Sequence, residues 1–221
     1  MIYGTPTTVT NGLVLYLDGY NLKSYVSGST IWNDISGGGN NGTLTNGPTF
    51  NSGGSILLDG VNDFVAIASA DAWRLATSST VIIWCNPVNN SGSIISFQKD
   101  GWLGWQFFSG GQIVYSGQAG ANDLNGSFGT LSYGSWQQLV LVVNRETAQY
   151  ILYRNGVSVS TSSITQTPIP SNAILYLGTR GSVGDQYANV NISNLQIYNR
   201  ALSAQEVLQN FNVMKSRFNL S

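Results

Sequence analysis

The chain is 221 residues long and only 9% of them are charged, with 9 Lys and Arg against 10 Asp and Glu and a net charge of -1. The cations are scattered singly, which excludes a basic patch of the kind that binds nucleic acid. Histidine is absent, which excludes Ser/His/Asp and Cys/His catalysis and any zinc site built on imidazole. With 42% hydrophobic residues and no break in composition, residues 1–221 are predicted to form one folded domain.

Short apolar segments separated by turn residues run along almost the whole chain and predict an all-β fold. The first, residues 13–17, is too short and too alternating to be a signal peptide or a membrane span. Further strands are expected at residues 56–58, 64–67, 80–84, 93–97, 105–108, 112–115, 138–143, 149–153, 157–159, 174–178 and 190–198.

The sharpest local signal is Asn155-Gly156, which separates two of these strands. This pair tolerates positive φ at both central positions of a two-residue loop, and it therefore predicts a β-hairpin.

After residue 198 the apolar period changes from two residues to about 3.6. Ser203 and Glu206 have the spacing of a capping box. These features predict a helix over about 203–217, packed on the sandwich by one face; binding of a partner by that face is the alternative. The face consists of Val207, Leu208, Phe211 and Met214.

Several aromatic and sulfur side chains are expected in the core. Cys85, the single cysteine, lies in an apolar run and is interpreted as a small buried hydrophobe. Trp84 and Trp136 lie in apolar strands and are also predicted to be core, and Trp105 is interpreted as core rather than as a binding residue.

Acidic residues near glycines have two interpretations. Asp34 precedes a Gly/Asn-rich segment, where an Asp side chain commonly accepts hydrogen bonds from backbone amides of a turn. Asp59 and Asp63 fit a hairpin turn, which is the preferred interpretation, or a metal site completed by Asn62.

Three polar loops carry the residue types that bind neutral glycans. Sugar rings stack their C–H faces on aromatic rings and present hydroxyls to amide, carboxylate and backbone groups. Loops at one rim of a rigid sandwich are suitable places for such recognition. Packing is the alternative for Trp102. The candidate carbohydrate-binding residues are Asp100, Trp102, Asn122, Asp123, Arg180, Asp185 and Tyr187.

Paired carboxylates, which retaining glycoside hydrolases need about 5–5.5 Å apart, are not evident in the strand patterns. Glu146 is expected in a turn and Glu206 in a helix cap, and neither has a carboxylate two or four residues away. No catalytic residue is therefore proposed, although a lyase site assembled from distant strands stays open.

Several sequence segments resemble those of the laminin-G-like branch of the concanavalin A-like lectins and glucanases. They are Asn-Gly-Leu-Val-Leu-Tyr-Leu-Asp from residue 11, the Gly/Asn-rich stretch 32–63, Trp-Gln-Gln-Leu-Val-Leu-Val-Val from residue 136, residues 152–157 and residues 192–207. The resemblance covers nearly the whole chain. It implies a jelly-roll sandwich of two antiparallel sheets with a short C-terminal helix, but it leaves the activity open because this fold carries many activities.

The resemblance also implies where ligands would bind. Many relatives bind sugars on the concave sheet or its rim, and some hold a structural calcium ion where the first and last strands meet. Asp18 and Asn194 match those strand positions, although relatives often have Asp where Asn194 stands. Calcium takes six to eight oxygen ligands. One structural calcium ion at Asp18 and Asn194, and no organic cofactor, is therefore the expectation.

Residues 41–50 look like laminin-G-like domains of bacteriophage tail and surface proteins. Particle assembly in the cytoplasm fits a module without disulfides. The hypothesis is a non-enzymatic lectin-like adhesion domain on the virion surface, in capsid or tail, with a surface glycan or polysaccharide and other virion proteins as partners. The alternatives are a structural decoration or spike subunit that forms a homo-oligomer, and then a polysaccharide-degrading enzyme. An extracellular place within a larger secreted protein is the other location.

Overall fold

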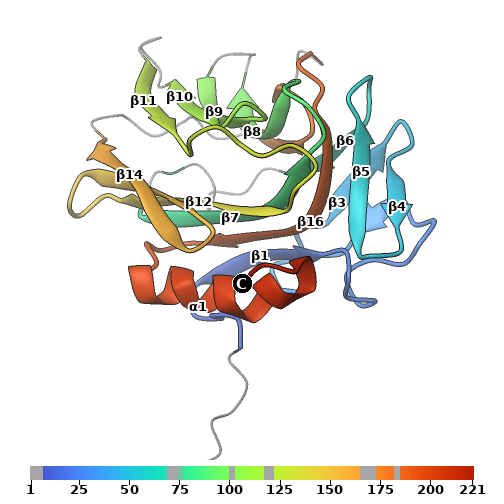
Figure 1. The fold of residues 1–221 in the computed structure, drawn as a ribbon, viewed down its shortest axis with the longest axis horizontal. Helices are drawn as coiled ribbons and strands as arrows, with labels where there is room; N and C mark the ends of the chain where they lie inside the picture. Colours follow the sequence, from blue (N-terminus) through green and yellow to red (C-terminus); the bar gives the residue numbers. More distant parts are fainter. Residues whose placement is uncertain are drawn as a thin grey trace, which may run out of the picture.

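The computed structural model describes residues 7–68, 75, 77–99, 103–116, 122–164, 173–181 and 185–221, and only the backbone of residues 98–99, 103, 115–116 and 122–125. The described chain folds into two stacked antiparallel sheets with one helix on the outside of one of them (Figure 1). This arrangement confirms the predicted all-β sandwich with a short C-terminal helix.

The helix-side sheet has eight strands. Its order is β14 (Val157–Ser163), β13 (Gln149–Arg154), β12 (Gln137–Asn144), β7 (Ser79–Pro87), β16 (Asn189–Tyr198), β5 (Ser55–Asp59) and β4 (Thr49–Asn51). The eighth strand, β1 (Leu13–Asp18), also pairs with β16. Residues 189–192 of β16 pair with β5 and residues 194–198 pair with β1, with an irregular register between them.

The outer sheet also has eight strands. Its order is β11 (Asn122–Ser127), β10 (Gln112–Ser116), β9 (Leu103–Phe108), β8 (Ser93–Lys99), β15 (Ile174–Leu177), β6 (Phe64–Ile67), β3 (Gly42–Thr45) and β2 (Ile31–Trp32). Alternate residues of these strands enter the space between the sheets, as the two-residue period of a strand requires. Trp105 and Phe107 of β9 lie there, with ring centroids 5.5 Å apart.

The helix-side sheet is buried on both faces. Helix α1 (Ala204–Met214) and the following 3-10 helix η3 (Lys215–Phe218) cover the face that points away from the outer sheet (Figure 1). Trp84 of β7 stacks there on Phe211 and Phe218, at centroid distances of 5.7 and 4.5 Å. Burial on both faces explains why β7 and β12 are continuous apolar runs rather than alternating ones.

The start of the described chain, residues 7–9, packs against α1. The Asn210 side chain accepts a hydrogen bond from the Val9 amide at 2.9 Å, and the Tyr198 hydroxyl donates to the Val9 carbonyl at 2.8 Å. The side-chain amide of Gln209 donates to the Thr7 carbonyl at 2.7 Å. Both ends of the described chain therefore lie on the helix-covered side of the sandwich.

The capping box is confirmed, because Ser203 accepts from the Glu206 amide and Glu206 accepts from the Ser203 amide. The predicted apolar face is wrong at one position. Leu208 is 44% exposed, and the fourth buried helix residue is Asn210. Asn210 is buried because its amide serves Val9 and Tyr198, a polar contact that a hydrophobic period does not reveal. The α-helix also ends at Met214, and η3 completes the segment.

The predicted strands are all present, and the hairpin at Asn155-Gly156 is confirmed with φ of 52° and 76°. Four strands escaped prediction: β2, β3, β4 and β11. Trp136, predicted as core, is only partly buried and packs on Phe218 at 4.6 Å. Among the described residues, no helix has the length and apolar character needed to cross a bilayer.

Candidate functional site

Two described stretches of one loop, residues 178–181 and 185–187, fold over the outer face of the outer sheet. Ile95 and Phe97 of β8 enter the core, so Ser96 between them points outward. Its hydroxyl donates to the Thr179 carbonyl at 2.8 Å and accepts from the Gly181 amide at 3.1 Å. Ser96 thereby fixes the first half of the loop to the middle of the sheet.

Gly92 anchors the second half of the loop. The Ser93 amide donates to the Gln186 carbonyl at 2.8 Å, and residues 93 and 187 form an isolated parallel bridge. Gly92 has φ of +68°, and a Cβ placed there would lie 2.1 Å from the Gln186 carbonyl oxygen. Only glycine permits this close approach of the two backbones.

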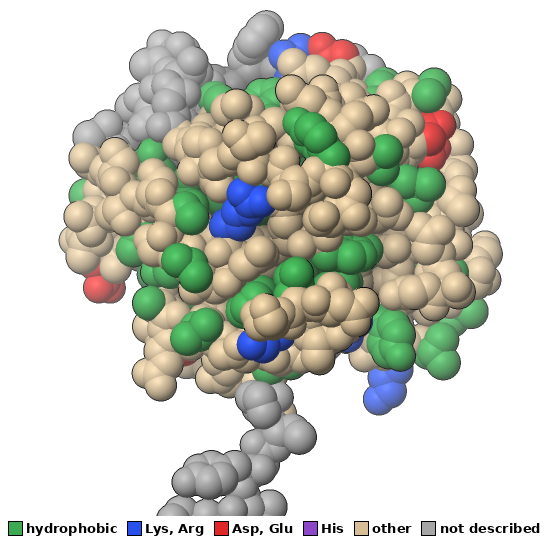
Figure 2. Space-filling model, in the orientation of Figure 1, with side chains coloured by type: hydrophobic (Ala, Val, Ile, Leu, Met, Phe, Trp, Pro, Cys, Tyr) green, Lys and Arg blue, Asp and Glu red, His purple; other side chains and the backbone are tan. Residues whose placement is uncertain are grey.

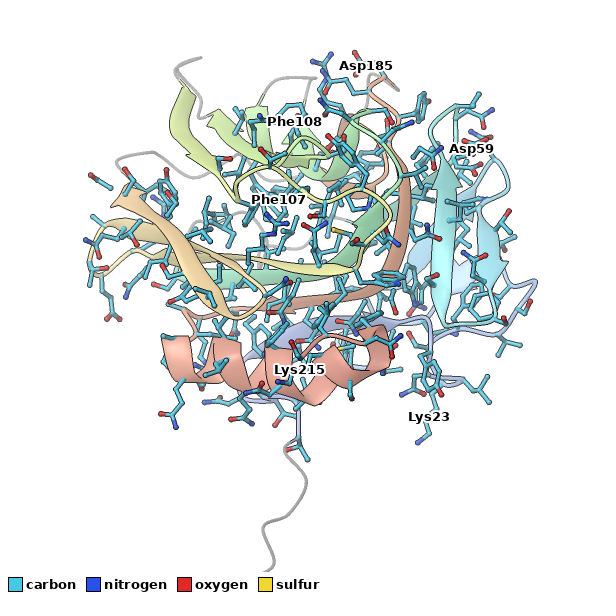
Figure 3. All side chains as sticks on the ribbon, in the orientation of Figure 1. Lys23, Asp59, Phe107, Phe108, Asp185 and Lys215 are labelled. Atoms are coloured by element: carbon cyan, nitrogen blue, oxygen red, sulfur yellow. The ribbon has the colours of Figure 1, made fainter. Side chains whose placement is uncertain are left out.

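Arg180 and Asp185, two of the candidate glycan-binding residues, form an ion pair within this loop. Arg180 Nε donates to Asp185 Oδ1 at 2.8 Å, and Nη2 contacts Oδ2. The Arg180 side chain is 16% exposed and that of Asp185 is 46% exposed. The pair thus holds the carboxylate in a fixed orientation while leaving part of it open to solvent, on the side of the molecule away from α1 (Figure 3).

An aromatic pair lies on the same face. Tyr176 of β15 and Phe64 of β6 meet edge to face, with centroids 5.9 Å apart and planes at 65°. Both rings are partly exposed. Partial burial raises the pKa of the Tyr176 hydroxyl, which therefore stays protonated and able to donate a hydrogen bond at neutral pH.

The strand register joins the aromatic pair to the loop. Tyr176 lies opposite Ser96, and Ser96 lies opposite Gln106 of β9. Gln106 is nearly buried because Gln186 of the loop covers it, with Gln106 Nε2 donating to Gln186 Oε1 at 3.0 Å. A row of outward side chains therefore runs from an aromatic ring to amides beneath the loop.

We call this region the outer-sheet surface and define it by Phe64, Gln106, Tyr176, Arg180, Asp185, Gln186 and Tyr187. Charged side chains are few and scattered on the face of the molecule drawn in Figure 2. Aromatic faces beside amide, hydroxyl and carboxylate groups provide stacking and hydrogen bonding for a polyhydroxylated ligand.

The structure brings only some of the predicted residues together. Arg180, Asp185 and Tyr187 share the loop, whereas Asn122 and Asp123 lie in β11, three strands from β8 and thus roughly 14 Å away. Their predicted location in a loop is wrong, because the backbone from residue 122 pairs with β10. Asp100 and Trp102 lie outside the described residues.

Phe64, Tyr176 and Gln106 were missed by the sequence reasoning. Each lies in a segment that was predicted as a strand, but no face was assigned to it. The available signal was alternation: Gln106 stands between Trp105 and Phe107, and Tyr176 between Leu175 and Leu177.

Asp18 and Asn194, predicted to hold calcium, are direct partners across β1 and β16. The Asp18 carboxylate accepts from Arg217 at 2.7 and 3.2 Å, from the Tyr20 amide at 3.0 Å and from the Tyr16 hydroxyl at 3.3 Å. Burial, followed by the charge of Asp18, raises the pKa of Tyr16. The buried amide group of Asn194 makes no well-formed hydrogen bond.

A calcium ion needs six to eight oxygen ligands, and this pair does not supply them in the observed arrangement. The Asp18 oxygens are taken up by four donors, including a cation, and only the Asn194 oxygen is unengaged. Within the described part of the chain, no three His, Cys, Asp or Glu side chains cluster as metal ligands. Calcium binding stays a prediction of the family resemblance.

The other acidic residues near glycines have structural roles. Asp34 accepts from the amides of Tyr16, Ser36 and Asn40, which confirms its predicted role in a turn. Asp59 accepts from the Val61 amide, which lowers its pKa. Burial, followed by the charge of Asp59, raises the pKa of Asp63.

Asp63 in turn accepts from the Asp59 amide at 3.3 Å. The two carboxylates thus direct oxygens at the backbone of their own turn, where β5 ends at Asp59 (Figure 3). The predicted turn is confirmed, but it is not a hairpin, because β5 and β6 belong to different sheets and the turn crosses from one sheet to the other.

Glu206 and Cys85 both have structural roles. Arg200 donates to both Glu206 oxygens, and this contact lowers the pKa of Glu206 to about 2. Glu206 is therefore a charged structural residue of the helix cap. Cys85 is fully buried, and burial raises the pKa of its thiol to about 12, so it is not a nucleophile in the folded protein.

Comparison with known families gives one assignment. The profile described as "Concanavalin A-like lectin/glucanases superfamily" matches residues 59–208, more than half of the chain. A comparison with curated proteins gave no match.

Solved structures share the fold at low identity. The binding domain of Paraclostridial Mosquitocidal Protein 1 is 19% identical with a TM-score of 0.71, and the match covers 91% of this chain and 52% of that chain. The botulinum neurotoxin serotype D binding domain is 14% identical with a TM-score of 0.72, and the match covers 92% of this chain and 52% of that chain. Trypanosoma rangeli sialidase in complex with sialic acid is 16% identical with a TM-score of 0.68, and the match covers 97% of this chain and 34% of that chain. The chain thus spans about half of the toxin domains and about a third of the sialidase.

Proposed function

Because the chain belongs to the concanavalin A-like lectin/glucanases superfamily, we propose that it is a non-enzymatic carbohydrate-binding adhesion domain. Its ligand is a surface glycan or polysaccharide, and the outer-sheet surface is the binding site. The observation that carries the proposal is the aromatic pair Phe64–Tyr176 beside a loop that holds the half-exposed carboxylate of Asp185.

The chemistry of the outer-sheet surface matches a neutral or weakly charged glycan. The Tyr176 and Phe64 rings offer faces for the C–H side of a sugar ring, and Asp185 accepts hydrogen bonds from hydroxyl groups. Ser96 and Gly92 fix the loop before binding, which lowers the ordering cost that a flexible site would pay. An extended chain of sugars would be long enough to reach from this surface toward Asn122 and Asp123 in β11.

A binding role is favoured over hydrolysis by the state of the carboxylates. Glu206 is held by Arg200, Asp185 by Arg180, and Asp59 and Asp63 by their own turn. Retaining and inverting glycosidases need two carboxyl groups that face one another across a substrate cleft. Two of the structural neighbours bear the words "binding domain" in their names, which supports the same choice. The sialidase, at 16% identity, supports the fold alone.

We place the domain on the surface of a bacteriophage virion, in capsid or tail, in contact with other virion proteins. One supporting observation is the Gly/Asn-rich sequence of residues 41–50. The other is the single buried cysteine, Cys85, which fits assembly in a reducing compartment. Display within a larger secreted protein is the other location. Electron microscopy of particles labelled with an antibody against this chain tests the virion location.

A structural virion subunit is the second candidate function. Its specific support is the exposed apolar set Tyr20, Leu22 and Val26, with Leu22 80% exposed. Exposed apolar side chains of this kind mark contacts between proteins when they gather in one patch. This candidate would be favoured if analytical ultracentrifugation showed a symmetric oligomer and the chain bound no glycan on a panel.

A glycan and bacterial-polysaccharide array probed with the full chain tests the adhesion role. Binding is expected to fall at least tenfold in Tyr176→Ala and in Asp185→Asn, because each removes a stacking or hydrogen-bonding group. Thr161→Val, an exposed change on β14, is the matched control. Unchanged binding in both site variants would show that the outer-sheet surface is not the site. Trp102→Ala and Asp123→Ala test its extension.

A further inference from the structure

A cavity of about 420 Å³ lies where the edges of the two sheets meet. It is bounded by Tyr25 and residues 27–30 before β2, by Leu44 of β3, and by residues 47–50 at the start of β4. Strands β2 and β4 are the edge strands of the outer and helix-side sheets. The volume falls within the range of about 300–1,000 Å³ typical of small-molecule sites. None of its lining residues belongs to the outer-sheet surface.

One wall of the cavity is aromatic and anchored in the core. The rings of Tyr25 and Phe50 lie 5.1 Å apart at an angle of 37°. Tyr25 is fixed from behind, because its hydroxyl donates to the Ser29 carbonyl at 2.8 Å and its ring meets Trp32 edge to face at 6.3 Å. Phe50 is only partly buried, so part of this fixed aromatic wall is open to a ligand.

The rim of the cavity carries hydroxyl groups and no charge. Ser27, Thr30 and Thr49 line it and are exposed. Their hydroxyls make no hydrogen bond within the described part of the chain. Gly28 and Gly47 also line the rim with φ of +86° and +103°, and a Cβ at either position would meet nothing within 4 Å. The mouth of the cavity is therefore open at both glycines.

We propose that this cavity is a second saccharide site that binds one neutral sugar ring. The partly exposed Phe50 ring would contact the C–H face of the sugar, and Thr30 and Thr49 would hydrogen-bond its hydroxyls. A charged ligand would lose its hydration without gaining a counter-charge, because the lining is uncharged. The inference takes its ligand class from the proposed function but rests on different residues.

Two sites on one rigid domain have a consequence for binding strength. A polysaccharide that reaches both would bind the second site as an intramolecular step, so its affinity would exceed that of either site alone. A single sugar would bind each site independently and weakly. Titration with monosaccharides therefore isolates the cavity from the combined effect.

The probes are the methyl glycosides of glucose, galactose, mannose and N-acetylglucosamine. Each is titrated into the ¹⁵N-labelled full chain and followed by amide chemical shifts. We expect at least one probe to shift amides of residues 25–30 and 44–50. The double variant Thr30→Val/Thr49→Val is expected to weaken binding of that probe about thirtyfold, because two hydrogen bonds of about 1 kcal/mol each are lost. Thr161→Val is the matched surface control and keeps the affinity.

Phe50→Leu tests the aromatic wall with an apolar replacement that does not leave a large void. It is expected to weaken the same probe several-fold while thermal unfolding shows a folded protein. If no probe shifts the cavity amides, or if the double variant binds as tightly as the unaltered chain, the cavity is not a saccharide site.

The variant Tyr176→Ala/Asp185→Asn separates this proposal from the proposed function. Monosaccharide shifts at the cavity are expected to persist in it while polysaccharide binding through the outer-sheet surface falls. Loss of the cavity shifts in this variant would overturn the independence of the second site. Retention of full polysaccharide binding would instead count against the outer-sheet surface and leave the cavity result intact.

Discussion

Arg217 binds the carboxylate of Asp18, with Nη1 2.7 Å from Oδ1 and Nη2 3.2 Å from Oδ2. The contact joins η3, near the end of the described chain, to the last residue of β1. Asp18 is almost completely buried, so the Arg217 guanidinium pairs with a carboxylate that is shielded from water. The Arg217 guanidinium also lies over the exposed Tyr20 ring at 4.8 Å. One side chain thus closes the C-terminal segment over the first strand.

Replacement of Arg217 by Met is expected to lower the free energy of unfolding by about 3 kcal/mol, because a buried carboxylate is left without its cation. Chemical denaturation measures the change. Lys215→Met is the matched control: Lys215 lies 5.9 Å from the Phe211 ring, a contact of about 0.5–1 kcal/mol. Equal losses in the two variants would mean that the Asp18 contact contributes nothing special.

The observed contacts of Asp18 predict that calcium leaves thermal unfolding of the unaltered chain unchanged, because Arg217, the Tyr20 amide and the Tyr16 hydroxyl already engage the carboxylate oxygens. Melting curves recorded with calcium chloride and with chelator provide the measurement. A higher Tm in calcium would show that an ion displaces Arg217 or binds elsewhere. Repeating the pair of curves with Asp18→Asn would distinguish these two outcomes.

Acid is expected to weaken the docking of α1 through Glu206. Arg200 lowers the pKa of this carboxyl from 4.5 to about 2. A lowered pKa in the folded state means that the contribution is present above about pH 4.5 and is lost as the pH falls through about 2. The partly exposed pair is worth about 1–2 kcal/mol after allowance for solvent screening.

Glu206→Gln isolates this charge, because Gln retains the hydrogen bond of the capping box. Its free energy of unfolding, measured from pH 7 to pH 2, is expected to change less than that of the unaltered chain. Parallel curves for the two proteins would assign the acid sensitivity to another carboxylate.

Gly92→Ala is expected to displace the loop of residues 178–187, because the added Cβ would lie 2.1 Å from the Gln186 carbonyl oxygen. The control is Gly37→Ala, which has φ of +95° and open space around the added atom. Gly37→Ala should lose about 1–2 kcal/mol from backbone strain alone, and Gly92→Ala should lose more. Only Gly92→Ala should weaken glycan binding on the array. Equal stability losses and equal binding would show that the loop tolerates the clash.

Local signals made much of the fold predictable. The continuous apolar runs of β7 and β12, the Asn155-Gly156 pair and the Ser203/Glu206 box each lie within a few residues. The missed strands are short or polar: β3 reads Gly-Thr-Leu-Thr and β2 has two residues. Such strands are held by their pairing partners, β2 by β3, β4 by β5 and β11 by β10, so their own residues carry little of the signal.

The candidate site was predictable only in part for the same reason. Arg180 and Asp185 lie five residues apart in a polar segment of the sequence, which made them recognisable as loop residues. Phe64 and Tyr176 meet only because β6 pairs with β15. In a single sequence an aromatic residue within a strand is indistinguishable from core until the face of its strand is known. The cavity at Tyr25 and Phe50 likewise needs two sheet edges to meet.

The packing of residues 7–9 against α1 determines from which side the domain can be attached to something larger. Val9 bonds to Asn210, and the C-terminus is marked beside α1 in Figure 1. The loop that holds Asp185 lies beyond the opposite sheet (Figure 3). A carrier, bead or sensor surface joined to either end would therefore sit behind the helix. The loop would then face outward, toward whatever the carrier approaches.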